Sequence, residues 1–269
     1  DNNICIGKQA NVSAATVSNE ITLGNSSITS LRIPGLQSGA ANGSVLTYNS
    51  TNGNIDLVAP SGLSNNSSNT QSIGVGTNAL DSETSGSENT AFGFGAGTSV
   101  TSGSSNVIVG RQAGSSLTTG NSNVLIGGGS TAEDQTSASA CTIVGSGAGA
   151  DNNAGNAVFI GHNAGRLNTS GGSNTAVGSS ALYSNTTASE NTAVGISAGY
   201  SVTTGNSNTF LGRAAGLLLT TGASNVIIGI DTAEEMTTAS GCTLVGGRAG
   251  FKNNADSVTY IGGSAGQNV

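Results

Sequence analysis

The chain has very few side chains that could perform acid–base or electrostatic chemistry. Of its 269 residues, 8% are charged, 3% are aromatic and none is Trp, whereas an average soluble domain carries about 25% charged residues. The single histidine, His162, has no nucleophile motif such as Gly-x-Ser-x-Gly beside it. It follows Gly161, where other repeats have Arg111 or Arg213, so we expect it in a surface turn. The composition favours a structural role over catalysis, with no cofactor and no metal.

Two further classes of function are excluded by what the chain lacks. The formal net charge is −7 and no basic patch is present, which argues against nucleic-acid binding. No run of 18 or more apolar residues could span a membrane. The chain begins at Asp1 without Met or a signal-peptide pattern and stops within a repeated phrase, so we expect a segment of a longer polypeptide.

Glycine and regularly spaced apolar residues are abundant instead, with 43 Gly and 35% hydrophobic residues. An apolar residue followed by Gly, usually in the frame Asn-Thr/Val-apolar-apolar-Gly, recurs twelve times at intervals of 16 to 18 residues. Its glycines are Gly76, Gly93, Gly110, Gly127, Gly145, Gly161, Gly178, Gly195, Gly212, Gly229, Gly246 and Gly262. Residues 89–165 also match residues 191–266 almost unit by unit, which indicates duplication of a block of six units.

The 17-residue unit predicts one coil of a β-solenoid. It is too short for a helical-hairpin repeat, which needs about 33 residues, and it is rich in Gly and β-branched residues that disfavour helix. Stacked coils separated by about 4.8 Å would hydrogen-bond to one another, so twelve coils predict a rod on the order of 55–60 Å long.

Strand alternation assigns the faces of each coil. We expect the apolar residue before each Gly, and the Thr or Val two residues earlier, to fill the core. The Ala of the Ala-Gly turn then forms a small opposite wall. The residue between these two core positions would point outward, and a continuous outward apolar stripe predicts an association surface. An alternative is that this residue forms a second core layer within one chain.

The outward stripe is our predicted homotrimer interface. It consists of Ala91, Ile108, Leu125, Ile143, Phe159, Ala176, Ala193, Phe210, Ile227, Leu244 and Tyr260.

The phrase Asn-Thr-Ala-Val-Gly with its small-residue turn resembles the head repeats of trimeric autotransporter adhesins. Similar repeats occur in tail fibres and spikes of phages and large viruses. The resemblance covers residues 69–269 and implies a left-handed parallel β-roll in each chain, three rolls around a threefold axis, and attachment to surfaces. The present unit has 17 residues rather than about 14, so the coil shape is expected to differ.

The N-terminal region supports a fibre. The segments NICIG (3–7) and EITLG (20–24) repeat the frame 17 residues apart, and GSVLTYNSTNGNIDLVAP (43–60) predicts a hairpin around Asn52-Gly53. This arrangement resembles the connector modules of viral tail fibres. We therefore expect a short β-roll-like segment (1–34), a hairpin connector with a polar linker (35–68) and the solenoid domain (69–269).

The remaining polar residues predict architecture rather than chemistry. The Asn that opens most frames should stack into a hydrogen-bonded ladder. Cys141 and Cys242 replace that Asn six coils apart, too far for a disulfide, so together with Cys5 they are expected to be separate thiols unless they pair between chains. Glu133-Asp134 and Glu234-Glu235 are expected in altered surface loops and are too few for a clear Ca²⁺ site.

The sequence thus predicts a segment of a homotrimeric fibre or spike that attaches a virus or phage to a host surface, exposed outside the cell. Its partners would be two further copies and a host receptor, a glycan or a surface protein. The first alternative is a bacterial trimeric surface adhesin or an extracellular filament. A single-chain solenoid that binds ice or degrades carbohydrate is disfavoured because the Thr pairs are interrupted and the acids are scattered.

Overall fold

The computed structural model describes residues 71–267 and, before them, the backbone of five short strands. The chain divides into two compact units, Asp1–Leu57 and Val58–Val269. In the first unit, β1 (Ile4–Ile6) pairs in parallel with β2 (Ile21–Leu23), and Ile4 lies opposite Ile21. This register confirms that the 17-residue frame already repeats there.

The predicted hairpin region forms a two-stranded sheet of β3 (Val45–Tyr48) and β4 (Ile55–Val58). The turn expected at Asn52-Gly53 and the side chain of Cys5 lie outside the described residues.

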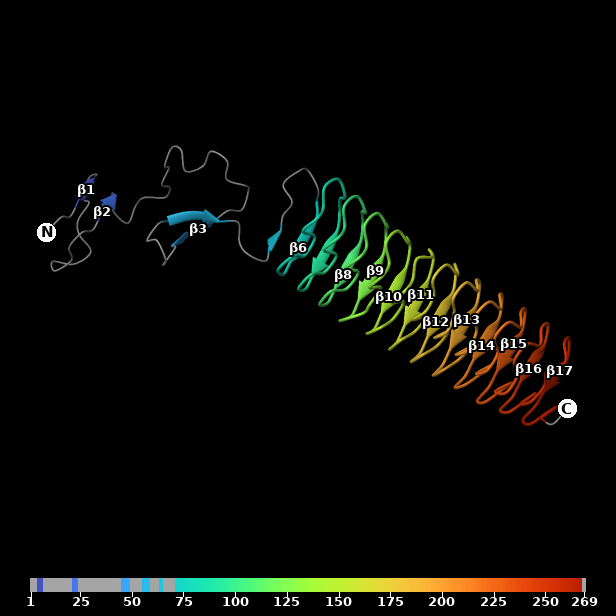
Figure 1. The fold of residues 1–269 in the computed structure, drawn as a ribbon. Helices are drawn as coiled ribbons and strands as arrows, with labels where there is room; N and C mark the ends of the chain where they lie inside the picture. The colour runs from blue at the N-terminus through green and yellow to red at the C-terminus, as the bar shows by residue number, and fades with distance from the viewer. Residues whose placement is uncertain are drawn as a thin grey trace. The chain divides into compact units, whose positions relative to one another are not determined.

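The second unit is an all-β parallel solenoid with one three-residue strand in each coil (Figure 1). A short strand, β5 (Leu63–Ser64), pairs antiparallel with the first of them. The parallel strands are β6 (Ile73–Val75), β7 (Thr90–Phe92), β8 (Val107–Val109), β9 (Val124–Ile126), β10 (Thr142–Val144), β11 (Val158–Ile160), β12 (Thr175–Val177), β13 (Thr192–Val194), β14 (Thr209–Leu211), β15 (Val226–Ile228), β16 (Thr243–Val245) and β17 (Thr259–Ile261).

Every coil stacks on the next without a change of register. The middle residues of neighbouring strands lie opposite one another, as Ala193 does with Phe210. Equivalent positions therefore form straight columns along the solenoid. The predicted all-β parallel solenoid and its 17-residue coil are confirmed.

The glycine after each strand is required by the close approach of neighbouring coils. At Gly161 the backbone has φ +136°, and a Cβ would lie 2.5 Å from the carbonyl oxygen of Gly178 in the next coil. A non-Gly residue would be strained both by this φ and by the contact. The repeated glycine is thus a position at which the backbone of the next coil leaves no room for a side chain.

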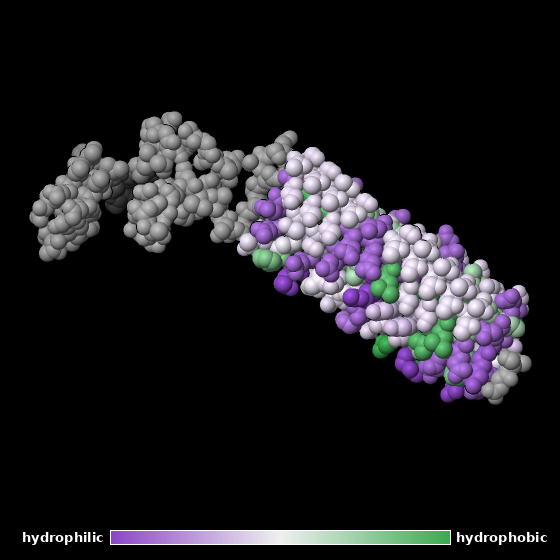
Figure 2. All heavy atoms as spheres, viewed as in Figure 1, coloured by the Kyte–Doolittle hydropathy of each residue, from purple (hydrophilic) through white to green (hydrophobic). Residues whose placement is uncertain are grey.

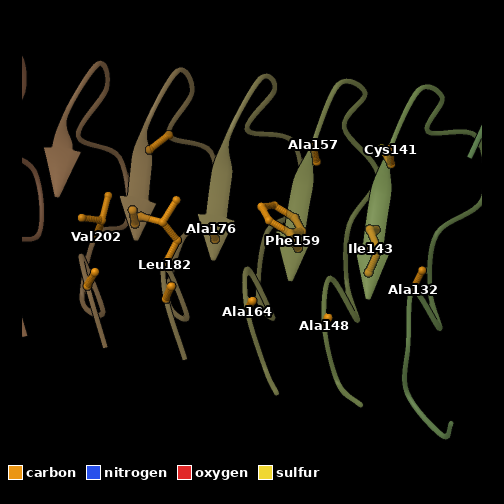
Figure 3. Close-up of a cluster of buried hydrophobic side chains, with 14 of the residues drawn as sticks. Ala132, Cys141, Ile143, Ala148, Ala157, Phe159, Ala164, Ala176, Leu182 and Val202 are labelled. Carbon is orange, nitrogen blue, oxygen red and sulfur yellow. The ribbon is translucent and has the colours of Figure 1, made fainter. Parts of the chain in front are cut away.

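The strand face that points into each coil is the opposite of the one we predicted. The middle residue of each strand is buried, and Figure 3 shows Ile143 and Phe159 pointing inward across from Ala148 and Ala164. The prediction that the stripe faces outward was wrong: Ala91, Ile108, Leu125, Ile143, Phe159, Ala176, Ala193, Phe210, Ile227 and Leu244 are 0% exposed in the single chain, and Tyr260 is half-buried. These residues form the core, so they are not a trimer surface.

Large and small residues complement one another in the interior, either within a coil or between neighbouring coils. Phe159 lies against Gly165, where an added Cβ would be 2.6 Å from the ring. Conversely, the coil with the small Ala176 has the larger Leu182 six residues later, and both are fully buried. At Gly199 an added Cβ would lie 2.8 Å from Phe210 and 2.9 Å from Leu182, which belong to the two neighbouring coils.

The alanine wall is where the sequence placed it. Its members are buried, except for the half-buried Ala265: Ala96, Ala113, Ala148, Ala164, Ala198, Ala215 and Ala249 are each 0% exposed.

Candidate interaction surface

The outward side chains of β6–β17 form a continuous face that we call the outer sheet face. It consists of the first and third residues of each strand, and none of these is buried. The first column is β-branched throughout: Ile73, Thr90, Val107, Val124, Thr142, Val158, Thr175, Thr192, Thr209, Val226, Thr243 and Thr259. The third column is apolar throughout: Val75, Phe92, Val109, Ile126, Val144, Ile160, Val177, Val194, Leu211, Ile228, Val245 and Ile261.

Several large apolar side chains on this face are exposed to solvent in the single chain. Phe92 is 58% exposed, Leu211 is 47% exposed, and Ile160 is 38% exposed. Figure 2 shows that hydrophobic residues reach the surface of the solenoid in patches between polar areas. An outward apolar stripe thus exists, but it consists of the residues that we had assigned to the core.

A buried ladder of asparagine side chains runs behind the first strand residues and holds the coils in register. Asn208 Nδ2 donates to Asn191 Oδ1 (3.1 Å) and to the carbonyl of Gly222 (2.9 Å). In turn, Asn208 Oδ1 accepts from the backbone N–H (3.0 Å) and the Nδ2 (2.9 Å) of Asn225. The predicted ladder is confirmed.

A second, shorter ladder lies on another side of the interior. Asn168 Nδ2 donates to Asn152 Oδ1, and Asn185 Nδ2 donates to Asn168 Oδ1, each at 2.6 Å. Asn185 Oδ1 is buried without a hydrogen-bond partner. The equivalent position of the next coil is the apolar Val202, so the ladder stops there. This ladder was not predicted, although Asn152, Asn168 and Asn185 recur at 16- to 17-residue spacing.

The two described cysteines are buried free thiols, as predicted. Each occupies an Asn position and keeps the backbone link of the ladder, as the Asn residues do. Cys141 N donates to Asn123 Oδ1 (3.0 Å), and Cys242 N donates to Asn225 Oδ1 (2.9 Å). Burial raises the pKa of the Cys141 thiol, against the opposing effect of the Ala157 backbone N–H. A thiol held protonated in this way is a poor nucleophile.

The acidic insertion Glu133-Asp134 lies in an exposed turn, as expected. Asp151 lies beside this turn in the next coil. Burial raises the pKa of its carboxyl, and repulsion from Asp134 adds to this effect, while Arg166 partly opposes it. Within residues 71–267, no three His, Cys, Asp or Glu side chains come together in a way that could hold a metal ion.

The turn column ten residues into the coil carries different residues in different coils. Tyr183 and Tyr200 stack there in adjacent coils, with ring centroids 5.0 Å apart. The equivalent of Tyr200 in the first block is Thr98. His162 is exposed in another turn, as predicted, and lies 3.3 Å from the amide of Asn163. Duplication has therefore preserved the apolar interior while the turn surface has diverged.

Comparison of the chain with protein-family models, with characterised proteins and with solved structures found no match. The part of the chain that the structure describes contains no helix able to cross a membrane.

Proposed function

We propose that the chain is a shaft or head segment of a homotrimeric fibre that attaches a virus or phage to its host surface. Each chain winds as a left-handed solenoid, three chains run in parallel, and the segment acts by binding rather than by catalysis. The receptor is a glycan or a protein on the host surface.

The observation that carries this proposal is the contrast between a uniform scaffold and a variable surface. The interior columns repeat along the solenoid, and the Asn ladder links Asn89 to Asn123 and Asn174 to Asn225. The outward turns vary, as at Tyr200 and its equivalent Thr98. Recognition residues on turns that a rigid scaffold positions are typical of binding proteins. Three parallel copies would multiply weak contacts by avidity, commonly by 10²–10⁴-fold.

The direct test is immunogold labelling of virions and cells of the source with Fab fragments raised against residues 71–267. The proposal expects labelled projections on the particle, and it expects both the Fab and the purified protein to reduce adsorption to host cells. A Fab against an unrelated virion protein is the control. Label on a bacterial envelope would favour the adhesin alternative, and normal adsorption in the presence of saturating Fab would contradict attachment.

A further inference from the structure

We propose that the outer sheet face is the interface at which copies of this chain pack side by side in parallel. This inference rests on the proposed homotrimer. It assigns the trimer interface to the outer sheet face instead of the buried middle column of the strands.

The third column of the face is apolar over its full length, and the first column combines Thr with Val and Ile. Phe92 near its N-terminal end, Val107 and Leu211 are 58%, 39% and 47% exposed, respectively. Scattered apolar residues need no explanation, but contiguous patches on soluble proteins mark association sites. No residue in either column is charged, so two identical faces can meet without like-charge repulsion or the cost of burying an ion.

The size of the face fits a specific interface between copies. Twelve strands at the usual 4.8 Å spacing extend about 53 Å, and three residues at 3.3 Å each add a width of about 10 Å. Each copy therefore offers on the order of 500 Å². Three such faces that meet around one axis bury about 1,500 Å² in the whole trimer, within the size range of specific associations.

A second copy of the chain has the same axial repeat as the outer sheet face. Because the columns repeat with every coil, only a partner with the same axial spacing places an apolar side chain opposite an apolar side chain along the whole length. Parallel, in-register copies bring Phe92 beside its own equivalents at one level. A slip by one coil would oppose it to the smaller Val75 or Val109, so the bulky residue fixes the register.

Two leucines of one coil provide a matched test. Leu211 lies on the outer sheet face and is 47% exposed, whereas Leu218 lies in a turn segment away from the strand and is 42% exposed. Both can be replaced by Glu in the full chain without burying charge in the monomer. The native mass is then measured by light scattering, with far-UV circular dichroism as the check on folding. The double variant Phe92→Glu/Leu211→Glu, which places a charge in each block, keeps the test decisive if one charge only weakens assembly.

The inference expects a wild-type mass near three times 25.9 kDa, with a threefold fall for the double variant and no change for Leu218→Glu. An oligomer that survives the double variant would overturn the interface while leaving the attachment fibre intact. A folded wild-type monomer would overturn both the interface and the trimer. Loss of adsorption inhibition with a normal trimer would instead contradict only the attachment function.

Discussion

Replacing Asn208 by Ala should destabilise the solenoid far more than its small side chain suggests. The change removes the acceptor for the Asn225 backbone N–H and the donor to the Gly222 carbonyl, at 3.0 and 2.9 Å. Asn208 is 1% exposed, so water cannot replace these bonds. Leaving a buried polar group unpaired costs about 1–3 kcal/mol, and two such groups predict a loss of about 2–6 kcal/mol.

Asn206→Ala is the matched control two residues away. Asn206 is exposed, and its Oδ1 accepts from the backbone N–H of Ser189 at 2.7 Å. Water can satisfy that N–H after the substitution, so the expected loss is about 0.5–1.5 kcal/mol. Guanidinium unfolding followed by circular dichroism compares the midpoints, and hydrogen exchange of the peptide containing Asn225 reports the local change. Equal effects of the two variants, or unchanged exchange at Asn225 in Asn208→Ala, would refute the structural role of the ladder.

Three further predictions follow from the interior and the turns. Gly161→Ala should lower the free energy of unfolding by about 2–5 kcal/mol, since it adds a strained φ and a clash with the next coil. Gly128→Ala is the control, because open space surrounds its position, and it should change the unfolding midpoint little. Equal midpoints would contradict the close contact between coils. Cys141 and Cys242 should resist iodoacetamide in native protein and react after unfolding, as peptide mass spectrometry can show; rapid native labelling would contradict their burial. Because the pKa of Asp151 is raised, the folded state binds this proton more tightly than the unfolded state, so stability falls as pH rises through the raised pKa. Asp151→Asn should therefore raise the unfolding midpoint at neutral pH but not in acid. A lower midpoint at neutral pH would contradict this direction.

The sequence was sufficient to predict the solenoid because two kinds of residue mark its period. Gly161 and its equivalents must accept a positive φ beside a neighbouring backbone. Asn208 donates and accepts along the axis, and its equivalents are Asn in most coils and Cys in two. The glycine recurs in every coil, so the coil length could be inferred from its spacing, and the repeated Asn indicated the ladder.

The orientation of the strands could not be inferred from alternation. A three-residue strand such as Thr209–Leu211 is apolar at its second and third positions, so both faces fit a core, and a shift by one residue exchanges them. A partial signal lay six residues further along. Phe210 is followed by Gly216 and Ala176 by Leu182, and such volume exchange indicates residues that share one interior. The exchange is absent in the coil of Ala193, which is followed by Gly199.

Cryo-electron microscopy of the wild-type particle tests the central claim most directly, because it shows both the number of chains and the faces that meet. The account predicts three parallel solenoids with their outer sheet faces turned toward one another and with Phe92 of all copies at one level. Single solenoids, or copies that meet through the turn column of Tyr183 and Tyr200, would contradict it.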